Sequence, residues 1–231
     1  MNKMLPTLIL IMGVLYIFII PAEPHAVKLI FKAIPMILVI AYACLQSAGN
    51  SKRFQRILLT GLVFCVIGDV TLDNFIVGLS AFLIGHLFYL SGFFSQWTFS
   101  AWRLVTVIPI GAYAVYMGYE LLEALTKSGD GGLKVPVLIY VTAISLMGWS
   151  AIMSGNAWAI AGALLFMASD SILAWNKFIS EVAYSDVLIM TTYYAAQFCI
   201  AACIGHPSRI ARNKRKRRRR LTEEQQHELR G

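Results

Sequence analysis

The sequence predicts an all-α membrane protein, a bundle of eight transmembrane helices with both termini in the cytoplasm. Of its 231 residues, 58% are hydrophobic and 14% are charged, whereas soluble domains have about 45–50% apolar and about 25% charged residues. The apolar residues also fall into blocks of about 20, the length that a helix needs to cross a bilayer. Because lipid offers no hydrogen bonds to the backbone, these blocks must be helical.

Eight apolar segments follow one another along the chain. The first follows Lys3 and resembles a signal peptide, but its apolar run is longer than that of a leader and no small-x-small cleavage site follows it. We therefore expect it to be a helix. The eight expected helices cover about residues 4–20, 28–46, 54–72, 75–95, 101–120, 135–153, 157–175 and 184–204.

The distribution of lysine and arginine predicts the orientation. With both termini inside, fifteen basic residues lie in cytoplasmic segments and five in outer segments. The opposite orientation would invert this bias. We expect two parts, an eight-helix catalytic domain in the membrane (residues 1–206) and a basic cytoplasmic tail (residues 207–231).

The tail contains a run of basic residues from Asn213 to Arg220. We interpret it as a topology anchor that contacts anionic lipid headgroups. Eight spans argue against a nucleic-acid partner, while a retrieval signal for the endoplasmic reticulum is an alternative. This tail and the absence of Asn-x-Ser/Thr sites favour the endoplasmic reticulum or another internal membrane.

The oligomeric state is not predicted. The cysteines, expected to be reduced, lie in apolar runs: Cys44, Cys65, Cys199 and Cys203.

Two aspartates lie at membrane depth, where an ionisable side chain costs several kcal/mol and usually marks function. Asp69 and Asp170 each follow at least twelve residues without a charge. We expect both to lie roughly 5–10 Å inside the outer ends of their helices, with Lys32 entering at a similar depth. The other ionisable candidates near the spans are Asp73, His86, Lys177, Glu181 and Asp186; all of these except His86 are interpreted as interfacial.

Polar aromatic and amide side chains occupy deeper positions on two of the helices. His86 and Tyr89 share one helix face, and so do Tyr193, Tyr194 and Gln197 on the last helix. We expect these residues to form the floor of one cavity. Taken alone, His86 is better explained as an interhelical hydrogen-bonding residue.

Paired carboxylates are suited to general acid and general base catalysis. Burial disfavours the charged form of a carboxyl group, whereas a neighbouring Lys32 would keep one of the pair ionised. The sequence contains no HExxH motif, P-loop, nucleophile elbow or dinucleotide-binding turn. An acid and a base in an apolar pocket would suit hydrolysis of an acid-labile bond in a lipid.

Four ordered motifs resemble the YhhN family of lysoplasmalogenases. Lys32 with Pro35 also resembles the Lys-Pro element of that family, although two residues separate them here. The resemblance covers about residues 5–204. The motifs are Gly68-Asp69, Phe82-Leu83-Ile84-Gly85-His86-Leu87-Phe88-Tyr89, Gly162-Ala163-Leu164-Leu165-Phe166 with Ser169-Asp170, and Tyr194-Ala195-Ala196-Gln197.

This resemblance implies an eight-helix fold and hydrolysis of the vinyl ether bond of lysoplasmalogens. The substrates would be alkenyl-glycerophosphocholine and alkenyl-glycerophosphoethanolamine, and the products a fatty aldehyde and the glycerophospho-base. It also implies that Asp69 and Asp170 are the catalytic acids; we assign the proton donor to Asp170. The residues expected to bind substrate or adjust the proton affinity of these carboxyls are Lys32, Asp73, His86, Tyr89, Asn176, Tyr194 and Gln197. No cofactor or metal is expected.

Three alternatives remain open. A proton-coupled transporter or lipid-binding protein would use Asp69 and Asp170 as a proton relay, and would release no aldehyde. A structural partner protein would depend on its basic tail and not on the aspartates. A third alternative keeps the hydrolase but adds a metal held by His86 and the two aspartates, which chelator sensitivity would support.

Overall fold

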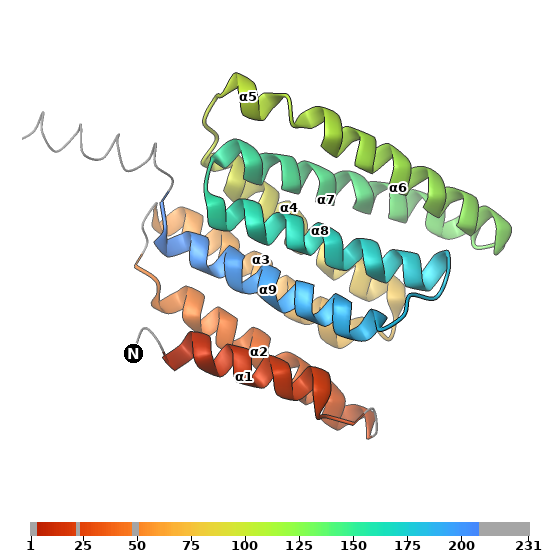
Figure 1. The fold of residues 1–231 in the computed structure, drawn as a ribbon, viewed down its shortest axis with the longest axis horizontal. Helices are drawn as coiled ribbons and strands as arrows, with labels where there is room; N and C mark the ends of the chain where they lie inside the picture. The colour runs from red at the N-terminus through yellow and green to blue at the C-terminus, as the bar shows by residue number, and fades with distance from the viewer. Residues whose placement is uncertain (1–3, 22–23, 48–50, 208–231) are drawn as a thin grey trace, which may run out of the picture.

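The computed structural model describes residues 4–21, 24–47 and 51–207, which form a bundle of roughly parallel and antiparallel helices (Figure 1). No strand occurs in this described part. The helices are α1 (Met4–Phe18), α2 (His25–Leu45), α3 (Lys52–Thr71), α4 (Phe75–Ser95), α5 (Ala101–Leu104), α6 (Val107–Lys127), the short 3-10 helix η1 (Gly131–Leu133), α7 (Lys134–Ser154), α8 (Ala157–Phe178) and α9 (Ser185–Gly205).

The helices confirm the predicted all-α membrane architecture. Within the described residues, seven helical segments are long and apolar enough to cross a membrane, and α1 is apolar but has only 15 residues. The chain is therefore an integral, multi-pass membrane protein with seven or eight spans. The cytoplasmic placement of the termini stays a prediction, and the predicted basic tail from residue 208 onward lies outside the described residues.

The fifth expected segment, residues 101–120, differs from the structure. It is divided into α5 and α6, and α6 continues to Lys127. Pro109 lies in the first turn of α6, where its missing N–H is tolerated, but it cannot donate to a carbonyl one turn earlier. The Val105 carbonyl, four residues before Pro109, instead accepts a hydrogen bond from the Ile108 N–H at 3.0 Å. The proline therefore explains the break.

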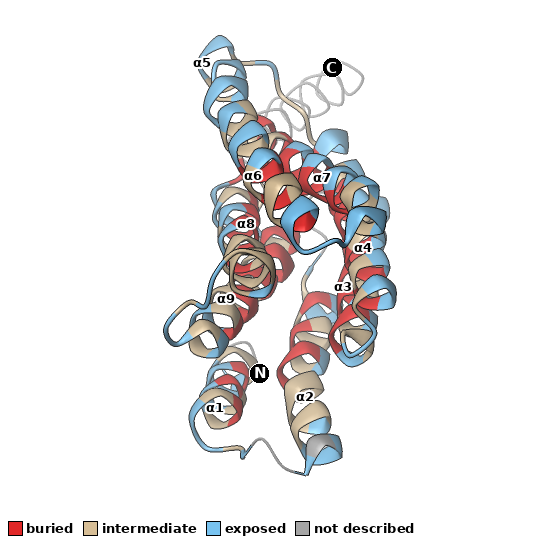
Figure 2. Cartoon of the chain, turned by 90° about the vertical axis from the view of Figure 1, so that its right-hand side faces the viewer, coloured by how far each residue is buried: buried red, intermediate tan, exposed pale blue. Residues whose placement is uncertain are grey.

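The helices pack as neighbouring pairs around a common interior. The main contacts join α3 to α4, α4 to α7 and α8 to α9, while α1 packs on α2 and α9. Figure 2 shows the bundle from one end, with buried residues facing inward and many exposed residues outward. Large apolar residues such as Leu10, Ile108 and Val115 are exposed on the outer face, as expected for a surface covered by lipid.

Two glycines allow helices to approach closely. A Cβ atom at Gly61 of α3 would lie 2.5 Å from the ring of Tyr89 on α4. One at Gly162 of α8 would lie 2.9 Å from the Ala196 carbonyl of α9. Small residues at such crossings are typical of membrane helices, whose association depends on packing. These two crossings hold α3 against α4 and α8 against α9. The two aspartates lie on α3 and α8.

Candidate active site

The two aspartates lie in α3 and α8, and both of these helices end at the same end of the bundle, the right-hand end in Figure 1. We call this the cavity end; it contains the last turns of α1, α3 and α8 and the first turns of α2 and α9. Asp69 precedes the last residue of α3 by two positions, about 3 Å, and Asp170 precedes that of α8 by eight, about 12 Å. The expected common depth of 5–10 Å is therefore wrong for both, because α3 ends one residue earlier than predicted and α8 continues three residues further.

Asp69 is buried and held by residues from two other helices. Its side chain is 3% exposed. The Nζ atom of Lys32 on α2 lies 3.5 Å from Oδ1, and the hydroxyl of Tyr193 on α9 donates to Oδ2 at 2.6 Å. Lys32 Nζ also lies 3.5 Å from the Asp69 main-chain oxygen. The expected meeting of Lys32 with an acid is thus found at Asp69.

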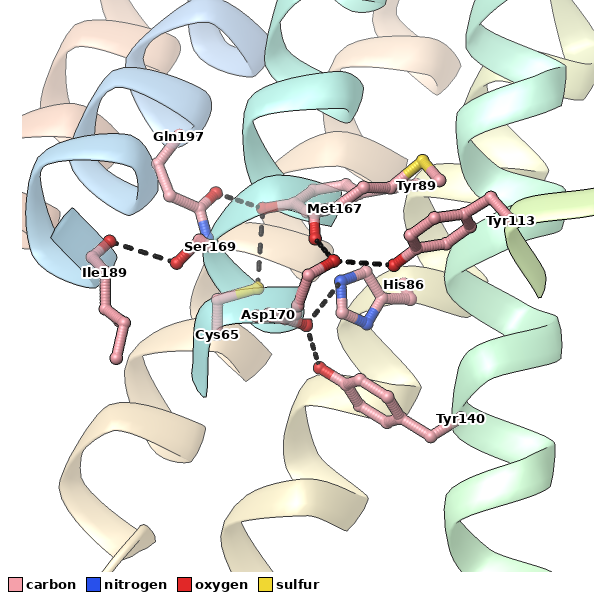
Figure 3. A network of polar contacts seen from close by, with 11 residues as sticks. Cys65, His86, Tyr89, Tyr113, Tyr140, Met167, Ser169, Asp170, Ile189 and Gln197 are labelled. Carbon is pink, nitrogen blue, oxygen red and sulfur yellow. Dashed lines mark hydrogen bonds and ion pairs between the residues drawn. The ribbon is translucent and has the colours of Figure 1, made fainter. Parts of the chain in front are cut away.

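Asp170 has a different environment, in which no lysine of the described residues forms an ion pair with it. The hydroxyl of Tyr140 on α7 donates to its Oδ2 atom. His86 Nε2 lies 3.9 Å from the same oxygen, which is beyond hydrogen-bond distance (Figure 3). The His86 ring is fully buried and packs edge-on against Phe166 at 4.5 Å. Neither of its ring nitrogens has a hydrogen-bond partner among the described residues.

The two carboxyl groups line different cavities that adjoin each other. A larger cavity of about 710 Å³ contains Asp69 and Lys32 and has several charged side chains in its wall. A smaller one of about 50 Å³ contains Asp170 and Tyr140 in a largely apolar wall. Both cavities are lined by Leu72, Phe75 and Leu173. The site therefore combines a charged compartment with an apolar compartment, and each has its own acid.

Of the other predicted site residues, some line a cavity and others form hydrogen bonds that hold helices or loops in place. Asp73, just after α3, lines the larger cavity. The hydroxyl of Tyr194 donates to the Lys32 carbonyl at 2.9 Å and so fixes α2 against α9. Asn176 accepts a hydrogen bond from the Val182 N–H at 2.9 Å and organises the loop before α9.

Tyr89 and Gln197 form a polar chain in the interior rather than the floor of a cavity. The Tyr89 hydroxyl donates to Gln197 Oε1 at 2.7 Å, and the Cys65 thiol lies 3.6 Å from the same hydroxyl (Figure 3). Neither Tyr89 nor Gln197 lines either cavity. In these two cavities of the described part, Tyr89 and Gln197 therefore do not form the expected floor, because they bond to each other between α4 and α9.

Sequence reasoning did not identify the two tyrosines that contact the carboxyls. The sequence predicts Tyr193 only as part of the floor of a cavity, and it predicts no role for Tyr140. A tyrosine within an apolar segment indicates such a contact, because a buried hydroxyl needs a hydrogen-bond partner. Lys177 and Asp186, interpreted as interfacial, also line the larger cavity, together with Lys28.

A metal-binding arrangement is not found in the described ranges. No group of three or more His, Cys, Asp or Glu side chains in them is placed to hold an ion. His86 lies beside Asp170, whereas Asp69 is held by Lys32 and Tyr193. The three ligands of the metal alternative are therefore not assembled.

Comparison with known proteins gives one family and several relatives. The model of the YhhN family matches residues 27–204. Lysoplasmalogenase TMEM86B of Mus musculus is 29% identical over 86% of this chain and 85% of its own length. Lysoplasmalogenase TMEM86A of Bos taurus is 33% identical over 78% of this chain and 79% of its own. A lysoplasmalogenase of Mycobacterium bovis is 29% identical over 74% and 68%, respectively. No solved structure matches the chain.

Proposed function

The chain belongs to the YhhN family, and from this premise we propose that it is a lysoplasmalogenase. Relatives from mammals and mycobacteria carry that name. The reaction would be hydrolysis of the vinyl ether bond of alkenyl-glycerophosphocholine and alkenyl-glycerophosphoethanolamine. Its products would be a fatty aldehyde and glycerophosphocholine or glycerophosphoethanolamine.

The observation that carries the proposal is the unlike surroundings of the two carboxyls. An ammonium group at 3.5 Å stabilises the carboxylate form of Asp69. Both carboxyls accept a hydrogen bond from a tyrosine, but Asp170 lines a largely apolar wall, which favours its neutral acid form. Two titratable groups with such different environments are the usual arrangement for an acid and a base in one site.

We assign the proton donor to Asp170. Tyr140 donates to Oδ2, so that Oδ1 is the oxygen that holds the catalytic proton. Transfer of this proton to the β-carbon of the vinyl ether converts the double bond into an oxocarbenium ion. The β-carbon belongs to the alkyl chain, which matches the apolar cavity that Asp170 lines. A saturated alkyl ether has no double bond to protonate and would not react.

We assign to Asp69 the stabilisation of the oxocarbenium ion and the activation of the attacking water. Its carboxylate stabilises the oxocarbenium ion and accepts a proton as water adds to the carbon next to oxygen. The hemiacetal then collapses: its hydroxyl returns a proton to Asp170, and Asp69 protonates the departing glycerol oxygen. Both carboxyls regain their starting forms, and the net change is addition of one water.

The test is an assay of free aldehyde. Purified, detergent-solubilised protein is incubated with a lysoplasmalogen and, separately, with its saturated alkyl-ether analogue. We expect aldehyde from the vinyl ether alone. Absence of aldehyde from protein that is folded, as shown by a cooperative thermal transition, would contradict the hydrolase and leave the aspartates as a proton relay.

A further inference from the structure

Charged side chains surround the larger cavity beyond the Lys32–Asp69 ion pair, nearer the cavity end. Lys28 precedes Lys32 by four residues on α2, so it lies about 6 Å or one helical turn further out, and Asp73 lies in the turn just after α3. Lys177 lies in the last turn of α8 and Asp186 in the first turn of α9. All four line the larger cavity.

This outer layer contains charges of both signs. Lys32 and Asp69 compensate each other in the ion pair. Lys28, Lys177 and Asp186 line the wall of the same cavity. A phosphodiester carries one negative charge and a choline or ethanolamine group one positive charge, so a zwitterionic headgroup finds a partner of opposite sign at both ends.

One of the lysines is placed at the boundary between the two cavities. The Nζ atom of Lys177 lies 4.7 Å from the ring centroid of Phe75, which lines both cavities. Such a cation–π contact orients the ammonium group without neutralising its charge. Lys177 is therefore available to an anion in the larger cavity.

Resting on the proposed function, we propose that Lys28 and Lys177 bind the phosphate of the lysophospholipid and that Asp186 faces its ammonium group. The glycerol backbone separates the ether oxygen from the phosphate oxygen by about 5 Å when extended. This span agrees with the single helical turn between Lys32 and Lys28. When the vinyl ether of the lysophospholipid lies beside Asp69 and Asp170, the phosphate of the same molecule therefore lies at the level of Lys28.

The phosphate subsite is tested by binding, so that the result does not depend on turnover. The ligands are a saturated alkyl-ether lysophosphocholine and the matching alkylglycerol, which lacks the phosphate. Isothermal titration on the full chain in detergent compares wild type with K28Q/K177Q. Loss of two partly exposed ionic contacts is expected to weaken lysophosphocholine binding roughly 5- to 10-fold and to leave alkylglycerol binding unchanged.

A matched control removes two lysines that do not line the cavity. Lys127 ends α6 and Lys134 begins α7, so K127Q/K134Q makes the same change of net charge. This control is expected to bind both ligands like wild type. An equal loss for both ligands in K28Q/K177Q, or no loss for either, would overturn the phosphate subsite.

The ammonium contact is tested with Asp186→Asn. It is expected to weaken binding of the alkyl-ether lysophosphocholine, but not of the alkyl-ether glycerophosphate, which has no ammonium group. Equal weakening of both would overturn this part of the proposal.

Two further measurements complete the test. One distinguishes a lipid phosphate from free phosphate as the ligand, and the other distinguishes the headgroup subsite from the proposed hydrolase. Inorganic phosphate at millimolar concentration is expected not to displace the lysophosphocholine, and displacement that requires Lys28 and Lys177 would show a simple anion site instead. If wild type releases no aldehyde but the binding pattern holds, the hydrolase is refuted and the headgroup subsite is retained.

Discussion

The Nζ atom of Lys32 lies 3.5 Å from Oδ1 of Asp69, which joins the start of α2 to the end of α3. Each carboxyl accepts a hydrogen bond from a tyrosine, but Asp170 lines a largely apolar cavity, whereas Asp69 has the ammonium group beside it. This asymmetry is the basis of the division into acid and base, and it makes the site testable one side chain at a time.

Each catalytic carboxyl should be essential. Asp69→Asn and Asp170→Asn keep the shape of the side chain but remove the acid, so each is expected to lower kcat for aldehyde release at least ~100-fold. Thermal unfolding in detergent checks the fold. Asp130→Asn, in the turn before η1 and outside both cavities, is the matched control and should retain wild-type activity. Full activity in either catalytic variant would falsify the mechanism.

The positive charge of Lys32 should matter more than its length. Lys32→Met removes the charge beside Asp69 and is expected to lower kcat roughly 10- to 100-fold, because the carboxylate form loses its partner. Lys32→Arg keeps a cation and is expected to recover part of this loss. Steady-state kinetics of aldehyde release measure both variants; equal activities in the two would contradict an electrostatic role.

The two tyrosine hydroxyls should position the carboxyls. Tyr193→Phe and Tyr140→Phe each remove one hydrogen bond to an aspartate and keep the ring. We expect kcat to fall about 10-fold, in line with a hydrogen bond to a charged or polarised group, with little change in KM. Tyr42→Phe is the control, since its ring stacks on Phe198 at 5.2 Å and lines neither cavity. A rise in KM alone would indicate substrate binding instead.

The glycine crossing between α8 and α9 should limit stability. At Gly162 an added methyl group would meet the Ala196 carbonyl and Ile200 at less than 3.0 Å, so Gly162→Ala is expected to destabilise the protein by about 1–3 kcal/mol. Gly111 on α6 has open space around its Cα, and Gly111→Ala should leave the melting temperature unchanged or slightly higher. Thermal unfolding of both variants in the same detergent measures the difference; equal melting temperatures would argue against this crossing.

The sequence by itself determined the membrane class, the apolar helices and the pair of acids. Helix formation in lipid is a local requirement, since every backbone group must be paired within its own segment, and hydropathy reports it directly. The two aspartates were identifiable because a charge is costly at that depth. The break between α5 and α6 is also encoded locally, by Pro109, although hydropathy predicts one continuous helix over residues 101–120.

Only the tertiary structure decided which side chains meet. Tyr193 and Asp69 are 124 residues apart, and Tyr89 and Gln197 are 108 apart. Such contacts depend on how α3, α4, α7 and α9 are rotated and how closely their glycines allow them to approach. Hydropathy does not fix this rotation, because lipid-facing and interior residues of a membrane helix are both apolar. The sequence therefore located the two acids, while helix packing gave each of them a tyrosine and placed Lys32 beside Asp69.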